Sequence, residues 1–181
     1  MEDIQIIKKA QTRNDVLDII KKRFSPRSFR PASLTHGEIN TLIEAASWAP
    51  SAMNEQPWRF VVALRSDEER FRKLADYLVP GNKAWATNAG ALVLILGKRS
   101  YTMNGKANVN TTHDVGMASM NMLLQAAGMD IFGHIMEGFH KNDVSEDFDL
   151  PAQDLVPVTM LALGRLDEPD KLDEPYYSRE V

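Results

Sequence analysis

The sequence predicts a single domain of the α/β or α+β class over residues 1–181. Helical and strand-like patterns alternate along the chain, which favours helices packed on the faces of a sheet. The apolar run at residues 91–96 has the length of a strand and no polar position, as expected for a strand covered on both faces. No internal repeat or low-complexity tract interrupts the chain, so its organisation predicts one domain.

Helix start signals set the expected elements of the first half. Asn14 can cap a helix through a side-chain oxygen. Thr35 and Glu38 have the spacing of a capping box, and Ser66 and Glu69 repeat it. We therefore expect a helix at 15–22, a helix from Thr35 that ends at Pro50, a strand at 58–64, and a helix from Ser66 that carries Phe71, Leu74 and Leu78.

Apolar patterning sets the elements of the second half. The segment Val79-Pro80-Gly81-Asn82 is expected to break the preceding helix. A helix at roughly 112–127 is apolar almost all round, which places it in the middle of the fold or in a subunit interface. The other expected elements are strands at 91–96, 131–135 and 156–163, a short helix around 142–148, and a charged, proline-punctuated tail after Gly164.

The composition excludes several classes of function. Hydrophobic residues make up 44% of the chain and charged residues 25%, which are ordinary values for a soluble globular protein. The net charge of -4 argues against a nucleic-acid partner, because nucleic-acid binding needs a basic surface. No apolar run is long enough to cross a bilayer, and Met1-Glu2-Asp3 lacks the basic-then-apolar plan of a signal peptide. We therefore expect a cytoplasmic protein with no membrane partner.

The residue types that most often act in catalysis show no catalytic or metal-binding pattern in this sequence. The chain has no cysteine, and its four histidines lack metal-ligand spacing, so no metal site is expected. His113 and Asp114 suggest general-base chemistry, but consecutive residues of a helix do not face each other. The glycine-rich dinucleotide signature, the P-loop and the nucleophile elbow are all missing. No catalytic side chain is expected.

The segment Arg23-Phe24-Ser25-Pro26-Arg27 is the first candidate binding site. Alternate side chains of an extended backbone point the same way, so Arg23, Ser25 and Arg27 can converge on one small anion. The planar guanidinium of arginine suits phosphate oxygens. A solvated surface turn is the alternative, but Pro26 fixes the backbone directly after a helix and Ser25 adds a donor. The segment therefore predicts phosphate binding.

The loop from Pro50 to Trp58 is the second candidate. It is bracketed by prolines and rich in small and amide side chains, as expected where backbone approaches a flat polar ligand closely. Asn54 and Gln56 offer donors and acceptors for the edge of a heterocycle, although any loop contains such residues. The turn Met136-Glu137-Gly138 is weaker, because on its residues alone it reads as a plain strand-to-loop turn. The first two segments together indicate a phosphate-bearing cofactor held at both ends.

These segments resemble motifs of the nitroreductase family of flavin mononucleotide (FMN) enzymes. Residues Arg23 to Phe29 are similar to the family's phosphate motif, and residues Trp48 to Trp58 are similar to its long second motif. The likeness continues through Asp114-Val115-Gly116, Glu137-Gly138 and Leu161-Ala162-Leu163-Gly164, so it covers nearly the whole chain in order.

The resemblance implies an α+β nitroreductase-like fold in which helices flank a central, mostly antiparallel sheet. It also implies one FMN-binding domain over residues 1–181 and an intertwined homodimer with FMN at the subunit interface. The cofactor-binding residues implied in this way are Arg23, Ser25 and Arg27 at the phosphate, Pro50, Ser51, Ala52 and Asn54 from the partner subunit, Asn82 at the ring, and Met136, Glu137 and Gly138, whose backbone amide faces flavin N5.

Two features differ from the family pattern. Members usually have a further basic segment that helps to hold the phosphate, and it does not occur before the last residue of the sequence, Val181. An insertion between the central helix and the glycine turn, which often builds a substrate lid, is also absent. The short chain therefore predicts an open, unselective active site.

The activity implied by the resemblance is transfer of hydride from NADH or NADPH through flavin N5 to a nitroaromatic, quinone or similar acceptor. The flavin carries this chemistry, so no catalytic side chain is needed, and the expected kinetics are ping-pong. The alternative is a non-catalytic flavin-binding or flavin-storage protein of the same fold. A different flavin reaction, such as reductive dehalogenation or flavin fragmentation, ranks lower because the lid residues of those branches are not found.

Overall fold

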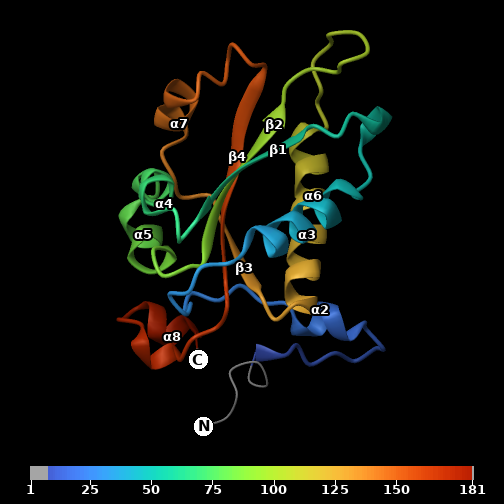
Figure 1. The fold of residues 1–181 in the computed structure, drawn as a ribbon. Coiled ribbons are helices and arrows are strands. Elements are labelled where there is room, and N and C mark those ends of the chain that lie inside the picture. Colours follow the sequence, from blue (N-terminus) through green and yellow to red (C-terminus); the bar gives the residue numbers. More distant parts are fainter. Residues whose placement is uncertain (1–7, 181) are drawn as a thin grey trace.

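The computed structural model describes residues 8–180 (Figure 1). Met1 to Asp3, which carry the signal-peptide argument, and Val181 lie outside the described residues. The strands are β1 (Trp58–Leu64), β2 (Ala91–Lys98), β3 (Phe132–Met136) and β4 (Leu155–Gly164). The helices are α2 (Asp18–Lys22), α3 (His36–Ser47), α4 (Glu68–Asp76), α5 (Pro80–Ala86), α6 (Thr111–Gly128), α7 (Lys141–Asp147) and α8 (Tyr176–Glu180), with short 3₁₀ turns η1 (Ala52–Asn54) and η2 (Pro169–Lys171).

The strands form one sheet in the order β1-β2-β4-β3, and every neighbouring pair is antiparallel. This arrangement confirms the antiparallel sheet implied by the family resemblance and decides between the two fold classes in favour of α+β. The central strand β2 is buried along Ala91 to Gly97, as its unbroken apolar run predicts.

Two hydrophobic cores lie on opposite faces of the sheet. Successive side chains of a strand point to opposite faces. Leu92 and Leu94 therefore pack with α4, α5 and α7, whereas Val93 and Ile95 pack with α3 and α6. Figure 1 shows these two groups of helices on either side of the strands. Burying one such side chain fully contributes about 1.5–3 kcal/mol, so both helical layers are held firmly to the sheet.

Several predicted elements are confirmed. The capping box at α3 is complete, since Thr35 Oγ1 accepts from the Glu38 amide at 3.2 Å and Glu38 Oε2 accepts from the Thr35 amide at 2.8 Å. The predicted strands and the helices at 112–127 and 142–148 match β1 to β4, α6 and α7 to within one or two residues.

Two predicted helix caps are wrong. The first helix begins at Asp18 rather than after Asn14, and its N-cap position is Leu17, which makes no side-chain cap bond. In α4 the cap is Asp67, whose Oδ1 accepts from the Arg70 amide at 3.2 Å. Ser66 and Asp67 are both good caps, and Asp67 takes the position while Ser66 Oγ accepts from Ser33 Oγ at 3.1 Å instead.

The segment predicted to break a helix also starts one. Helix α4 ends at Asp76, so Leu78 lies beyond it and pairs with Phe139 through an isolated bridge. Pro80 then occupies the first turn of α5, a position where its missing N–H costs nothing. Among residues 8–180, no helix has both the length and the hydropathy needed to cross a bilayer.

Candidate functional site

The first candidate segment, Arg23 to Arg27, is called the cationic segment below. It leaves helical geometry immediately after α2. Arg23, the C-cap of that helix, has extended backbone angles (φ -66°, ψ 123°), so helical geometry ends before Pro26 is reached. Its guanidinium Nη1 lies 3.4 Å from Ser25 Oγ, so the structure brings these two predicted site residues together. Phe24 points the other way and packs on Phe132 of β3 at a ring-centroid distance of 5.2 Å. Arg23 and Ser25 therefore lie together with Phe24 turned away, whereas the convergence of Arg27 with them stays a prediction.

Two aromatic side chains, those of His134 and Trp85, contact the same segment. His134 on β3 bonds the Pro26 carbonyl through Nδ1 at 2.9 Å. Because a carbonyl only accepts, Nδ1 of His134 carries the hydrogen. The Trp85 ring lies 4.6 Å from the His134 ring and 5.9 Å from the guanidinium carbon of Arg27. The third predicted phosphate ligand therefore stacks on a fully buried tryptophan.

Burial lowers the pKa of His134 below its ordinary value of 6.5. The hydrogen bond to Pro26 opposes this change, and the positive charge of Arg27 adds to it. The imidazole is therefore neutral near pH 7. It bonds the backbone at Pro26 without adding a further positive charge close to Arg23 and Arg27.

The second segment is a loop with an unusual backbone. Met53, Asn54 and Gln56 have φ values of 57°, 51° and 50°, a region that residues other than glycine and asparagine rarely adopt. Side chains close the loop on itself: Ser51 Oγ accepts from the Gln56 amide, and Gln56 Nε2 donates to Asn54 Oδ1, both at 3.0 Å. The two amide side chains expected at a heterocycle edge thus bond each other in this structure.

A buried carboxylate holds the same loop to α6. Asp114, only 1% exposed, accepts a hydrogen bond from the Ala52 amide through Oδ2 at 2.9 Å. Its Oδ1 lies 3.2 Å from His113 Nδ1, so the expectation that these two consecutive side chains do not meet is wrong. His113 itself is largely exposed. Asp114 therefore fixes the backbone of a predicted site residue rather than forming part of a buried acid–base pair.

A second carboxylate ties the loop to the segment that follows β2. Glu55 Oε1 lies 3.0 Å from Lys98 Nζ, and its Oε2 accepts from the Thr102 amide at 2.8 Å. Hydrogen bonding from Thr102, together with Lys98, lowers the pKa of Glu55 to about 2 although burial opposes the change. The Glu55 side chain is 6% exposed, so the pair is shielded from solvent more than a surface ion pair.

The turn at the end of β3 meets another predicted residue, Asn82. Asn82 Nδ2 donates to the Gly138 carbonyl at 3.0 Å. A Cβ at Gly138 would lie 2.8 Å from both Asn82 Nδ2 and Val79 Cγ2, so this close approach requires glycine. Met136 is buried, and its carbonyl accepts from Thr159 Oγ1 at 2.9 Å. The turn is therefore fixed on both sides.

A groove of about 340 Å³ opens beside this turn. Glu137 lines it together with residues of α6 and β4, and its carboxylate pairs with Lys141 Nζ at 2.8 Å. Gly116 of α6 also lines the groove, and no atom outside the neighbouring backbone of its own helix lies within 4 Å of where its Cβ would stand. The groove is mostly apolar, with a few polar groups at its rim, which is typical of a site for a flat organic ring.

The two predicted binding segments lie at opposite ends of α6 (Figure 1). Ala52 contacts Asp114 in the first turn of that helix, whereas Phe24 contacts Phe132, which follows its last turn. A helix of 18 residues is about 27 Å long. One chain therefore does not bring both segments to the same small cofactor.

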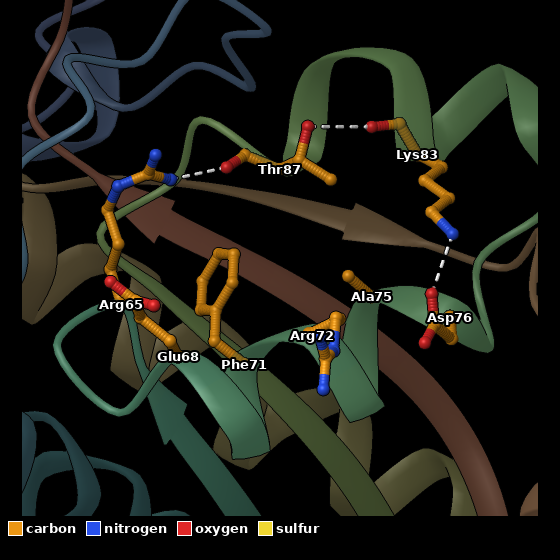
Figure 2. Close-up of a pocket in the computed structure, with 8 residues that line it drawn as sticks. All are labelled: Arg65, Glu68, Phe71, Arg72, Ala75, Asp76, Lys83 and Thr87. Carbon is orange, nitrogen blue, oxygen red and sulfur yellow. Dashed lines mark hydrogen bonds and ion pairs between the residues drawn. The ribbon is translucent and has the colours of Figure 1, made fainter.

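The pocket drawn in Figure 2 lies at α4 and α5 and contains none of the predicted site residues. Lys83 Nζ pairs with Asp76 Oδ1 at 2.7 Å. Arg65 donates to the Thr87 carbonyl, and its guanidinium lies 5.7 Å from the Phe71 ring centroid. The basic groups Lys83 and Arg65 are thus engaged within the protein, and the pocket is not the candidate site.

Sequence reasoning missed the residues that support the two segments. His134 and Glu55 have no local pattern that distinguishes them, because their partners lie 108 and 43–47 residues away. Asp114 did carry a signal, as an acidic residue in the first turn of an otherwise apolar helix. The binding segments themselves stand out in the sequence, whereas their supports become visible only in the fold.

Known proteins resemble this chain over most of its length. The model of the Nitroreductase family matches residues 20–85 and 76–165. A crystal structure described as an oxidoreductase containing FMN has a TM-score of 0.89 and 30% sequence identity, covering 96% of this chain and 88% of that one. Protein DrgA of Synechocystis is 29% identical over 184 residues, or 85% of each chain. A Bacillus subtilis protein provisionally named NAD(P)H nitroreductase YdgI is 26% identical over 189 residues, 84% of this chain and 88% of its own.

Proposed function

Because this chain belongs to the nitroreductase family, we propose that it is an FMN-dependent oxidoreductase that uses NADH or NADPH. Its acceptor in this proposal is a nitroaromatic, a quinone or a similar compound. The similarity to YdgI and to the neighbour described as containing FMN supports the nicotinamide donor and the flavin. One FMN-binding domain over residues 1–181 and a cytoplasmic location remain predictions from the sequence.

The observation that carries the proposal is that the arginines of the cationic segment lack acidic partners among the described residues. Within residues 8–180, neither Arg23 nor Arg27 forms an ion pair with an acidic side chain. The segment nevertheless has a fixed backbone, because β3 holds Pro26 through His134. Two guanidiniums without an acidic partner in the described part of the chain, one of them 3.4 Å from a hydroxyl, on a fixed backbone suit the phosphate of FMN.

The ring end of the cofactor fits the groove beside Glu137. The strand that carries His134 ends at Met136, so the phosphate segment and the groove are joined by three residues of β3, or about 10 Å. The fixed backbone at Glu137 and Gly138 is available to a ring in the groove without any particular side chain. Bound FMN would supply hydride acceptance and donation at N5, which is why the chain needs no catalytic acid or base of its own.

The separation of the two segments supports a homodimer. Antiparallel packing of α6 against its copy would place the loop of Pro50 to Asn54 beside the partner's cationic segment. Met120, near the middle of α6, is 45% exposed, and Trp48 and Met53 near the loop are 80% and 70% exposed. In a dimer of this kind these side chains would be covered by the partner subunit, as expected where exposed apolar side chains gather on one surface. In this proposal the flavin lies between two subunits.

The test is the visible absorption spectrum of the purified protein reconstituted with FMN, recorded before and after anaerobic addition of NADH or NADPH. The proposal predicts flavin bands that bleach on addition and recover when a quinone is added. Bands that persist with both donors would contradict it and favour the storage alternative. Protein that takes up no FMN would overturn the cofactor assignment as well.

Steady-state kinetics test the order of the two half-reactions. A single groove that receives the donor and then the acceptor predicts parallel double-reciprocal lines, the ping-pong pattern. Intersecting lines would show that donor and acceptor bind together, and they would contradict the shared groove.

A further inference from the structure

The cationic segment has a support that neither its sequence pattern nor the proposed function explains. Glu180, at the end of α8, is only 2% exposed. Its carboxylate accepts from the Arg27 amide at 3.0 and 3.1 Å and from the Ser28 amide at 3.4 Å. Arg27 is one of the residues expected to hold the FMN phosphate, so a carboxylate from 153 residues away fixes the backbone of a predicted ligand.

The chain between β4 and α8 runs beside the same segment. The Arg30 amide donates to the Arg165 carbonyl at 2.9 Å, and Ser28 Oγ donates to the Glu168 carbonyl at 2.7 Å. Phe29 and Leu166 form an isolated antiparallel bridge. Glu180 is therefore the last contact in a continuous line of bonds to residues 27–30.

A buried carboxylate is costly unless hydrogen bonds compensate it. Within residues 8–180 the bonds to Glu180 all come from backbone amides, and no guanidinium pairs with it. The acid thus holds the main chain of Arg27 while the Arg27 side chain stays over Trp85. The backbone of Arg27 is therefore held by Glu180, whereas its guanidinium is the group that binds the phosphate in the proposed function.

Resting on the proposed function, we propose that Glu180 is a positioning residue for the FMN phosphate, acting through the backbone of Arg27. It touches neither the cofactor nor the substrate. Losing it releases the backbone at Arg27 and Ser28, so the guanidinium of Arg27 must be ordered when FMN binds. Affinity for the phosphate falls, and affinity for the flavin ring does not.

The experiment compares FMN with riboflavin, which has the same ring and no phosphate. Dissociation constants are measured by flavin fluorescence quenching on flavin-free wild type, Glu180→Ala and Glu180→Gln. Glu174→Gln is the matched control, because Glu174 accepts from Ser178 Oγ within the same C-terminal segment and is exposed. We expect Glu180→Ala to weaken FMN binding about tenfold and Glu180→Gln to weaken it less. Neither variant should change riboflavin binding, because the hydrogen bonds lost with the Glu180 carboxylate lie only at the phosphate end of the site.

A double variant tests whether the effect passes through Arg27. If it does, Glu180→Ala adds little to the loss caused by Arg27→Ala, whereas independent effects multiply. Equal weakening of FMN and riboflavin, unchanged FMN affinity in both Glu180 variants, or multiplied effects would overturn the inference while leaving the proposed function intact. Wild-type protein that binds neither flavin would instead overturn the proposed function, and this inference with it.

Discussion

The two binding segments are both held through their backbone, but their side chains differ in what they bond. In the segment 23–28 the bonds from His134 and Glu180 fall on the backbone, and the side chains of Arg23 and Arg27 have no acidic partner among the described residues. In the loop 50–57 the restraints come from Asp114 and Glu55, and side chains close the loop while its backbone adopts left-handed angles. Over residues 8–180, the first segment leaves charged side chains without an acidic partner, whereas the polar side chains of the second, Ser51, Asn54 and Gln56, bond within the loop. This difference matches what each end of FMN offers, an anion at one end and a flat polar ring at the other.

The largest expected effect comes from the side chains of the first segment. Arg27→Ala removes a guanidinium from the phosphate and should weaken FMN binding between about tenfold and about a hundredfold, the range for hydrogen bonds to a charged group. Turnover of the flavin-loaded fraction should change far less. Fluorescence titration and activity per bound flavin measure the two quantities. Arg30→Ala is the control, since Arg30 is exposed and bonds Arg165 only through its backbone. Equal FMN affinity in the two variants would remove the phosphate assignment.

The next effect is on the second segment and acts on stability. Asp114→Asn keeps the size of the side chain but loses a buried, charged acceptor for the Ala52 amide. It should lower the free energy of unfolding by about 2 kcal/mol, measured by urea denaturation. Asp15→Asn, at an exposed position, should leave it unchanged. A matching, small change in both variants would show that Asp114 does not hold the loop.

A smaller, pH-dependent effect is expected at Glu55. Glu55→Gln should lower the free energy of unfolding by about 1 kcal/mol near pH 7. Because the folded-state pKa of Glu55 is about 2, below its ordinary value of 4.5, the wild-type advantage should be complete above pH 4.5 and lost as pH falls through 2. Unfolding of both proteins at a series of pH values measures this difference. An advantage that does not depend on pH would mean that packing, not charge, holds Glu55.

The smallest effect sharpens the distinction between ring and phosphate. Gly116→Ala adds a methyl where no atom outside the neighbouring backbone of its own helix lies within 4 Å, and in a helix it should stabilise the flavin-free protein by up to about 1 kcal/mol. If the groove receives the flavin ring, the methyl should weaken the binding of FMN and of riboflavin to the same extent. Arg27→Ala, in contrast, should weaken the binding of FMN alone. Gly37→Ala, in the first turn of α3, is the control. Unchanged affinity for both flavins would place the ring elsewhere.

The sequence predicted what is local in this molecule and missed what is distant. The strand at β2 could be predicted because six consecutive apolar residues are buried on both faces. Helix α5 could not, since a proline that breaks one helix also starts the next, and only tertiary packing decides between these outcomes. The same holds at the site. Arg23, Ser25 and Arg27 are recognisable by their spacing, but the bond from Glu180 joins residues that no local pattern connects.

The most direct test of the two-segment account is a crystal structure of the protein with FMN bound. We predict that the phosphate lies within hydrogen-bond distance of the Arg27 guanidinium and Ser25 Oγ of one subunit. The backbone of Pro50 to Asn54 from the partner should lie against the flavin ring, with the ring beside Glu137. A phosphate bound away from Arg23 and Arg27, or a ring contacted by both segments of a single chain, would contradict the account.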